Sequence, residues 1–203
     1  MTDLNFDLDH LKEGYDCIAG IDEVGRGCLF GDVVAACVIM PMDKAIDGVT
    51  DSKKLSPKKR GLLEAAIKER AVFYAYANEN AQVIDAINIK QATRRAMKAV
   101  AEKAMARFPD KNILFLVDAE TMDLDCHQAA IVHGDDLSYT IACASILAKE
   151  HRDRLCIQWG EDYPGYGIEK HKGYGTKQHR EAIRALGPSA GHRMSFLTKI
   201  LNK

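Results

Sequence analysis

Acidic side chains stand near the ends of apolar segments in this sequence. Asp22 and Glu23 lie late in the run 17–24, and Asp118 directly follows the run 112–117. An apolar strand gains nothing from such acids, because burying an unpaired carboxylate is costly. Carboxylate oxygens are suitable ligands for a hard divalent cation such as Mg²⁺ or Mn²⁺. The acids therefore indicate a metal site, with solvated turn residues as the simpler alternative.

A glycine-rich turn follows the first two acids. Residues 17–24 and 33–40 have the composition of two strands, and the segment between them contains Gly25, Arg26, Gly27 and Gly31. Glycine lets the main chain approach a ligand closely. We therefore expect this turn to contact whatever is held beside the acids.

Hydrophobic periodicity predicts the elements that position these residues. Further strands are expected at 72–77, 112–118 and 128–133, and helices at 57–69, 81–87, 89–108, 138–159 and 176–186, with a short terminal helix. A hairpin followed by strands joined through long helices is typical of a mixed sheet with helices on its faces. Ligands of such sheets bind beyond the carboxyl ends of central strands, where both Asp22 and Asp118 fall.

The chain has the size and composition of one globular domain. It has 203 residues, of which 47% are hydrophobic and 28% charged, and we expect one compact unit made of residues 1–160 and a C-terminal part, 161–203. No apolar run is long enough to span a membrane. The acidic first 16 residues lack the layout of a signal peptide, which predicts a cytoplasmic protein. The six cysteines include no C-x-x-C pair, so neither a zinc site nor a disulfide framework is indicated.

Basic residues are concentrated in two stretches, although the formal net charge is −1. Residues 51–70 contain seven Lys or Arg and three acids, and residues 165–203 contain eight Lys or Arg and two acids. Basic flanks around an acidic centre suit a protein that grips phosphates and also concentrates metal ions. The alternative is that these stretches are only solvated helix faces.

Five segments together resemble the ribonuclease HII family in their order and approximate spacing. They are DEVGRG at 22–27, DSKKLS at 51–56, LVDAE at 116–120, ASILAKEHRDR at 144–154 and HKGYGT at 171–176. The combination of DEVGRG with HKGYG is specific, and the segments extend through nearly the whole chain. The resemblance implies an α/β, ribonuclease-H-like fold: a mixed five-stranded sheet flanked by helices, with a small helical C-terminal extension.

The resemblance also implies an activity and its cofactor. The family cuts the RNA strand of RNA–DNA hybrids and nicks duplex DNA 5′ of an embedded ribonucleotide, leaving a 3′-hydroxyl and a 5′-phosphate. Its catalytic and metal-binding carboxylates correspond here to Asp22, Glu23, Asp118 and Asp153. Two Mg²⁺ or Mn²⁺ ions about 4 Å apart can clamp a scissile phosphate and activate a water. The expected role is the removal of ribonucleotides and RNA primers from DNA. The protein is expected to be a monomer.

Further residues correspond to substrate contacts. In the family the turn Gly25-Arg26-Gly27 and the tyrosine matching Tyr174 read the junction between a ribonucleotide and a deoxyribonucleotide, which requires sensing a 2′-hydroxyl. The expected phosphate contacts are basic side chains, namely Lys53, Lys54, Lys149, Lys172 and Arg193. The three histidines of the C-terminal part could serve in proton transfer or phosphate binding, but polar surface residues are the favoured interpretation. They are His171, His179 and His192.

Some features of the chain conflict with a regular strand or with the family pattern. Neighbours on a strand point to opposite faces, so the strand is expected to end or bulge for Asp22 and Glu23 both to act as ligands. Ala119-Glu120 replaces the usual glycine-asparagine pair, and Cys28 and Asp32 replace usual prolines. The stretch GDDLSYT at 134–140 replaces a usually basic one.

Two other functions compete with the endonuclease. A non-catalytic module that binds hybrids would need an incomplete set of acids, whereas all four are present in this sequence. A metal-dependent phosphohydrolase for small molecules would need no long basic surface. The two basic stretches therefore favour a polyanionic substrate.

Overall fold

The computed structural model describes residues 2–201, which form a five-stranded sheet covered by helices. The strand order is β3-β2-β1-β4-β5. β2 runs antiparallel to β1 and β3, and β4 runs parallel to β1 and β5. The strands are β1 (Cys17–Val24), β2 (Val33–Ile39), β3 (Phe73–Glu79), β4 (Ile113–Asp118) and β5 (His127–Ile131). The predicted mixed five-stranded sheet is confirmed.

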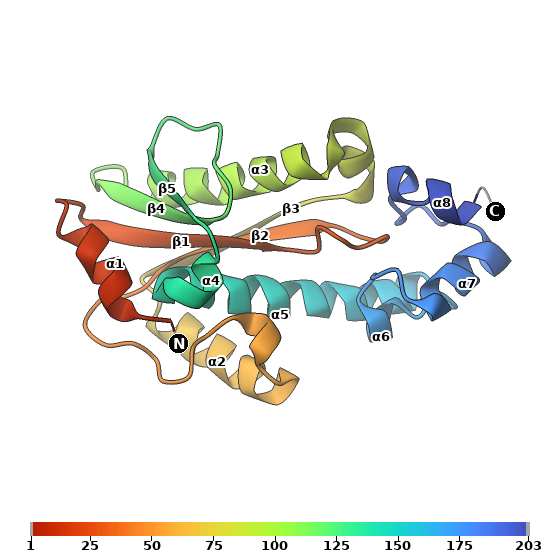
Figure 1. The fold of residues 1–203 in the computed structure, drawn as a ribbon, viewed down its shortest axis with the longest axis horizontal. Helices are drawn as coiled ribbons and strands as arrows, with labels where there is room; N and C mark the ends of the chain where they lie inside the picture. Colours follow the sequence, from red (N-terminus) through yellow and green to blue (C-terminus); the bar gives the residue numbers. More distant parts are fainter. Residues whose placement is uncertain (1, 202–203) are drawn as a thin grey trace.

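Helices cover both faces of the sheet (Figure 1). α3 (Ala81–Arg107) lies on one face, and α2 (Pro57–Arg70) and α5 (Tyr139–Asp162) lie on the other. The shorter helices are α1 (Leu4–Leu11), α4 (Gly134–Leu137), α6 (Ile168–His171), α7 (Lys177–Leu186) and α8 (Thr198–Leu201), and Ser52–Lys54 and Met194–Phe196 form 3-10 turns. Within residues 2–201, no helix is both long and apolar enough to cross a bilayer.

Two apolar layers hold the sheet between its helices. Because side chains alternate along a strand, Ala35 and Cys37 of β2 pack toward α3, whereas Ala36 and Val38 pack toward α2 and α5. The central strands are therefore buried on both faces, which is why they appear in the sequence as nearly continuous apolar runs. Their carboxyl ends are held rigidly.

Most predicted elements agree with the structure to within a few residues. The two helices expected at 81–87 and 89–108 are both present within α3, and they are separated at Asn88, whose φ of 67° interrupts the helical geometry. α1 was not predicted, because its short acidic sequence carries little periodic signal. The buried carboxylate of Asp7 on α1 accepts a hydrogen bond from the Thr140 amide at 2.8 Å, and this contact caps the start of α5 from a distant part of the chain.

β1 approaches α5 very closely at Gly20. A Cβ built on Gly20 would lie 2.2 Å from the backbone carbon of Thr140, so β1 and α5 touch backbone to backbone. Gly20→Ala is expected to lower the free energy of unfolding by about 1–3 kcal/mol or more, because neither backbone can move aside. Urea denaturation followed by circular dichroism measures this change.

Gly61, inside α2, provides the matched control. A Cβ there meets nothing within 4 Å, and alanine is the better helix former by roughly 0.5–1 kcal/mol. Gly61→Ala should therefore be neutral or stabilising. An equal loss of stability in both variants would contradict the close-contact argument.

Candidate active site

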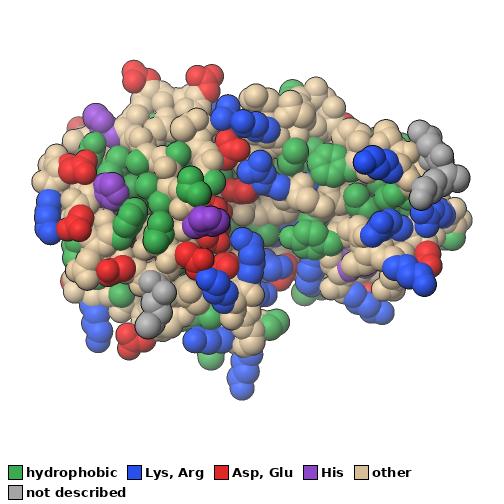
Figure 2. Space-filling view, viewed as in Figure 1, with side chains coloured by type: hydrophobic (Ala, Val, Ile, Leu, Met, Phe, Trp, Pro, Cys, Tyr) green, Lys and Arg blue, Asp and Glu red, His purple; other side chains and the backbone are tan. Residues whose placement is uncertain are grey.

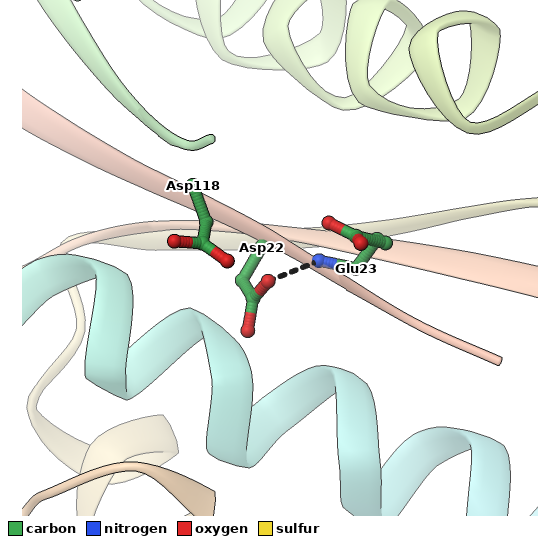
Figure 3. A group of neighbouring side chains, drawn as sticks. All are labelled: Asp22, Glu23 and Asp118. Carbon is green, nitrogen blue, oxygen red and sulfur yellow. Dashed lines mark hydrogen bonds between the residues drawn. The ribbon is translucent and has the colours of Figure 1, made fainter. Parts of the chain in front are cut away.

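Three acids converge at the carboxyl ends of the two central strands. One carboxylate oxygen from each of Asp22, Glu23 and Asp118 lies within 4.8 Å of the others. Asp22 and Glu23 come from β1, and Asp118 is the last residue of β4. In Figure 3, Asp22 points toward α5, Glu23 lies on the other side of β1, and the Asp118 carboxylate reaches in beside them. The predicted convergence of these three residues is observed.

β1 neither ends nor bulges at Glu23, so the prediction of an interrupted strand is wrong. β1 keeps a regular antiparallel register with β2 through Glu23↔Ala35 and Val24↔Val34. On its other side, however, the paired residues of β1 and β4 end at Ile21↔Val117, and the chain turns at Ala119 with a φ of 50°. No strand then lies beside Glu23 on that edge. Side chains from opposite faces of β1 can therefore meet around the open edge without any distortion of the strand.

Burial sets the protonation behaviour of this cluster. The pKa of Asp22 is raised well above its usual value, chiefly by desolvation and then by the charges of Glu23 and Asp118. Desolvation also raises the pKa values of Glu23 and Asp118. The repulsion expected between the acids is present, but the loss of solvent is the larger cause.

The protein supplies little positive charge to this cluster. Among residues 2–201, neither Asp22 nor Asp118 forms an ion pair, and Glu23 has only Arg26, at 3.4 Å. Asp22 accepts a hydrogen bond from the Glu23 amide at 2.7 Å, and Asp118 accepts one from the Gly134 amide at 2.8 Å. The Oε2 atom of Glu23 is buried without a hydrogen-bond partner. Hard oxygen donors that lack a cation fit a divalent metal ion.

Asp153 lies outside the cluster. Its carboxylate pairs with Arg60 at 3.1 Å and with Lys149. The α5 residue beside Asp22 is Ser145, whose hydroxyl lowers the pKa of Asp22. Ser145 and Asp153 share a helical face, but eight residues separate them by about 12 Å along the axis. The structure therefore does not bring together all four acids named from the sequence.

Asp135 is the acid that sequence reasoning missed. It lies on α4, is 7% exposed, and its charge raises the pKa of Asp118. The amide of the preceding residue, Gly134, is the one that bonds to Asp118. A possible sequence signal was the acidic GDD at 134–136, which was interpreted only as the loss of a basic contact.

The segment that contains Lys53 is anchored beside the acids. The Ser52 and Ser145 hydroxyls are hydrogen-bonded at 2.8 Å, which ties this segment to α5. The Lys53 side chain is 78% exposed, and its amine lies 3.4 Å from Asp135. Its charge also lowers the pKa of Asp118. Lys53 is therefore well placed for an anion that approaches the acids.

The other lysines named from the sequence lie in different surroundings. Lys54 pairs with Asp136 on the surface. Lys149 pairs with Asp153, and the amine of Lys172 donates to the Glu169 carbonyl at 2.7 Å. Only Lys54 among these three has a side chain that is more than half exposed.

The glycine turn lies against the loop that carries Tyr174. Cys28 and Tyr174 form an isolated antiparallel bridge, and the Leu29 amide donates to the Gly173 carbonyl at 2.8 Å. A Cβ added to Gly27 would meet nothing within 4 Å, so the turn is open there. The Tyr174 side chain is also exposed. The structure thus brings together the two junction-reading segments named from the sequence.

Arg193 is not at the surface. It is 0% exposed, and its guanidinium donates to the carbonyls of Arg26 at 2.9 Å and Gly31 at 2.8 Å. It can therefore touch no phosphate in this conformation. Its position indicates that it holds the turn from within, which corrects the expected phosphate contact.

The surface assignment is also wrong for two of the histidines. His179 and His192 are buried and lie 3.2 Å apart between their Nε2 atoms. Burial lowers the pKa of each to about 4, so both are neutral near pH 7. His179 also contacts the carbonyl of Tyr174 at 3.0 Å, so the pair supports the tyrosine loop.

Glu120 is neutralised within the protein. Its carboxylate lies 3.0 Å from Arg94 and 3.5 Å from Arg26. The departure from the family pattern at this position therefore adds no free negative charge beside the metal site. It gives Arg26 a second acidic partner besides Glu23.

The distribution of charge on the surface agrees with this arrangement. Figure 2 shows acidic side chains near the middle of the face, with Lys and Arg side chains beside them and over the C-terminal helices to the right. The C-terminal basic stretch thus lies to one side of the acidic middle of this face.

Comparisons with known proteins agree on one family. The sequence model of ribonuclease HII matches residues 19–199. The chain is 53% identical over 206 residues to a ribonuclease HII of Alkaliphilus metalliredigens, covering 99% of this chain and 100% of the relative. It is 55% identical over 196 residues to that of Alkaliphilus oremlandii, covering 94% and 95%.

Solved structures share the fold. The ribonuclease H2 of Pyrococcus horikoshii OT3 superposes with a TM-score of 0.69 at 22% identity, covering 92% of this chain and 97% of that one. A Bst-RNase HIII in complex with Mn²⁺ superposes with a TM-score of 0.67 at 18% identity, covering 92% and 69%.

The raised pKa values predict how stability depends on pH in the metal-free protein. At a pH between its unfolded-state and native-state pKa values, a carboxyl with a raised native pKa is protonated in the native protein but ionised in the unfolded chain. Stability is therefore expected to fall as pH rises from about 4 through the raised values. Asp22→Asn removes the carboxyl whose pKa is raised most, so at pH 7 it should be more stable than wild type.

Urea unfolding in chelator between pH 4 and 8 measures this dependence. Asp123→Asn, in an exposed loop, is the control and should follow the wild-type pH profile. If Asp22→Asn also follows that profile, or is the less stable protein at pH 7, the cluster is not electrostatically strained.

Proposed function

The chain belongs to the ribonuclease HII family, and on this premise we propose that it is an endonuclease for RNA–DNA hybrids and for single ribonucleotides in duplex DNA. The cut would fall 5′ of the ribonucleotide and leave a 3′-hydroxyl and a 5′-phosphate. The observation that carries this proposal is the group of three carboxylates at the carboxyl ends of β1 and β4, of which only Glu23 has an ion-pair partner among residues 2–201. Removal of ribonucleotides and RNA primers from DNA is the corresponding role.

Asp22, Glu23 and Asp118 are the proposed metal ligands. Two Mg²⁺ or Mn²⁺ ions, when bound, supply Lewis-acid activation of the attacking water and stabilise the leaving oxygen. The protein's own contribution is a set of oxygen donors fixed on rigid strand ends. The close approach of β1 to α5 at Gly20 keeps these ends in place, so little reorganisation is needed.

Asp135 is the proposed fourth acid, in place of Asp153. Its carboxylate is nearly buried and acts on the pKa of Asp118, whereas Asp153 is already neutralised by Arg60 and Lys149. An acid outside the three-residue group can orient water or complete the coordination sphere of a second ion. Lys53 would move from Asp135 toward a substrate phosphate.

The turn Gly25-Arg26-Gly27 and Tyr174 are the proposed readers of the junction. Backbone groups of the turn can sense a 2′-hydroxyl, because glycine leaves them accessible. The exposed ring of Tyr174, held beside Cys28, can stack on a sugar that lacks this hydroxyl. The two readers would then face consecutive nucleotides.

A binding module without catalysis is disfavoured by the same geometry. Binding alone gains nothing from a buried group of carboxylates, because negative charge repels a polyanion. A hydrolase for small phosphate esters would not need the basic side chains that lie beside the acids and over the C-terminal helices in Figure 2.

A duplex DNA with one ribonucleotide tests the proposed activity. With Mg²⁺ or Mn²⁺, wild-type protein should nick the ribonucleotide-containing strand on the 5′ side of the ribonucleotide, and excess chelator should abolish the product. Asp118→Asn should lower the rate by about 100-fold or more, because it removes a charged ligand. Gel analysis of end-labelled products, with all-DNA duplex as control, measures this. Cutting in chelator, or binding without cutting in metal, would refute the proposed chemistry.

Paired substitutions distinguish the two candidates for the fourth acid. Asp135→Asn is expected to reduce the rate by about 10- to 100-fold and to weaken Mn²⁺ binding, since outer partners of a metal site commonly contribute this much. Asp153→Asn should leave Mn²⁺ affinity unchanged, because its carboxylate is turned to Arg60 and Lys149. Titration calorimetry with Mn²⁺ and the nicking assay measure both effects. If Asp153→Asn lowered the rate and the Mn²⁺ affinity and Asp135→Asn did not, the fourth acid would be Asp153 and not Asp135.

A further inference from the structure

Arg152, the neighbour of Asp153, is a buried cation that the proposed chemistry does not use. Its side chain is 1% exposed, and it forms no salt bridge with any acid in residues 2–201. Its guanidinium instead donates to three backbone carbonyls: Nε to Asp32 at 2.9 Å, Nη2 to Phe30 at 3.0 Å and Nη1 to Lys172 at 2.8 Å. Two of these carbonyls belong to the segment after β1, and the third belongs to the loop before Tyr174.

Both segments pack directly on this guanidinium. A Cβ built on Gly25 would lie 2.3 Å from Nε of Arg152, and one built on Gly173 would lie 2.8 Å from the Phe30 carbonyl oxygen and 3.5 Å from Nη2. Both glycines also have positive φ angles, 94° and 82°. The two segments therefore contact the buried cation where only glycine fits.

The energetics argue against a purely packing role. A buried charge without a salt bridge is expensive, and an apolar side chain of similar volume would fill the space at lower cost. Arg152 lowers the pKa of one acid, Asp32, without forming a salt bridge with it. A planar guanidinium differs from such a side chain in one respect, because its rigid fork can hold several carbonyls at fixed directions. Arg152 thus sets the distance and orientation between two backbone segments.

Arg193 also donates from the interior to backbone carbonyls of this turn. It is also fully buried without a salt bridge in the described part of the chain, and it donates to the carbonyls of Arg26 and Gly31. Its amide donates to the Leu29 carbonyl at 2.9 Å. Arg152 and Arg193 thus both donate from the interior to carbonyls in and just after the turn. The side of the turn at Gly27 stays open for a ligand.

We propose that Arg152 is a positioning residue that fixes the spacing between the turn Gly25-Arg26-Gly27 and the Tyr174 loop. It thereby sets the preference for a ribonucleotide followed by a deoxyribonucleotide. This inference rests on the proposed function, and it assigns no contact between Arg152 and the substrate. Loss of Arg152 should impair substrates that need both readers more than substrates that offer ribose at every position.

Three variants test the inference. Arg152→Met removes the charge and the three donors but keeps much of the volume. Arg152→Lys keeps the charge, and its single ammonium cannot span three separate carbonyls; it serves where the methionine variant fails to fold. Arg154→Met is the matched control, because Arg154 lies on the same helix and bonds to Glu64 at the surface, away from the turn.

Activity on two substrates gives the first measurement. For both Arg152 variants, kcat/KM on the single-ribonucleotide duplex should fall about 10- to 100-fold, the scale of a small misplacement of a positioned group. On a long RNA–DNA hybrid the loss should be much smaller. Mn²⁺ affinity should not change, because the acids lie on other elements. An equal loss on both substrates, or no loss on either, would overturn the proposal.

A double-mutant cycle separates positioning from general damage. If Arg152 acts through the Tyr174 loop, Arg152→Lys in a Tyr174→Ala background should add little further loss on the single-ribonucleotide substrate. Full additivity of the two losses would contradict the proposal. A wild-type protein that cuts neither substrate would refute the proposed function instead, so the two failures are distinguishable.

Fluorescence provides a measurement that does not depend on catalysis. Trp159 is the single tryptophan of the chain, and the guanidinium carbon of Arg152 lies 5.8 Å from the centre of its ring. Arg152→Lys should shift the emission of Trp159 and increase its quenching by acrylamide, because the two segments loosen around it. Arg154→Met should leave both unchanged. Unaltered emission and quenching in Arg152→Lys would show that the guanidinium does not hold these segments together.

Discussion

Three carboxylates held close together are the constraint on which the rest of this structure depends. Among residues 2–201 their one ion-pair partner is Arg26, beside Glu23. Desolvation is the main cause that raises the pKa values of Asp22, Glu23 and Asp118. Repulsion from neighbouring acids adds to it, from within the cluster at Asp22 and Glu23 and from Asp135 at Asp118, so the metal-free cluster opposes folding. The surrounding core has to offset this cost. It does so with strands buried on both faces and a backbone contact at Gly20 that leaves no room for a side chain. Stability is therefore concentrated beneath the site, and the site itself is the destabilised part.

The two segments proposed to recognise the substrate have the opposite problem. The turn after β1 and the Tyr174 loop are irregular segments whose carbonyl groups need partners once they are buried. Arg152 and Arg193 supply these partners from the interior. An acidic centre open to metal ions thus lies beside a turn whose carbonyls are bound to buried cations. The negative charges of the three carboxylates and the positive charges of the two buried arginines are separated by a short distance. This arrangement suits a phosphodiester held between metal ions and the proposed junction-reading turn.

The neutral histidines of the C-terminal part extend the same support. His179 and His192 stay uncharged because burial lowers both pKa values to about 4, so they add no repulsion to the nearby arginines at neutral pH. Their mutual contact and the bond to the Tyr174 carbonyl fix the loop by hydrogen bonding alone. The C-terminal part therefore supports the Tyr174 loop of the proposed substrate site.

The sequence by itself determined the elements and the strand-end acids. Apolar runs define β1 and β4, and their carboxyl ends place Asp22 and Asp118 together, because parallel neighbours end at the same edge of a sheet. The family segments identified the turn and Tyr174 in the same way. Tertiary structure alone decided that Asp135, and not Asp153, lies near Asp118, and that Arg193 points inward. Helical periodicity gives the face of α5 but not the turn of the helix that meets the sheet edge. The burial of an arginine likewise depends on carbonyls that only the folded chain brings together.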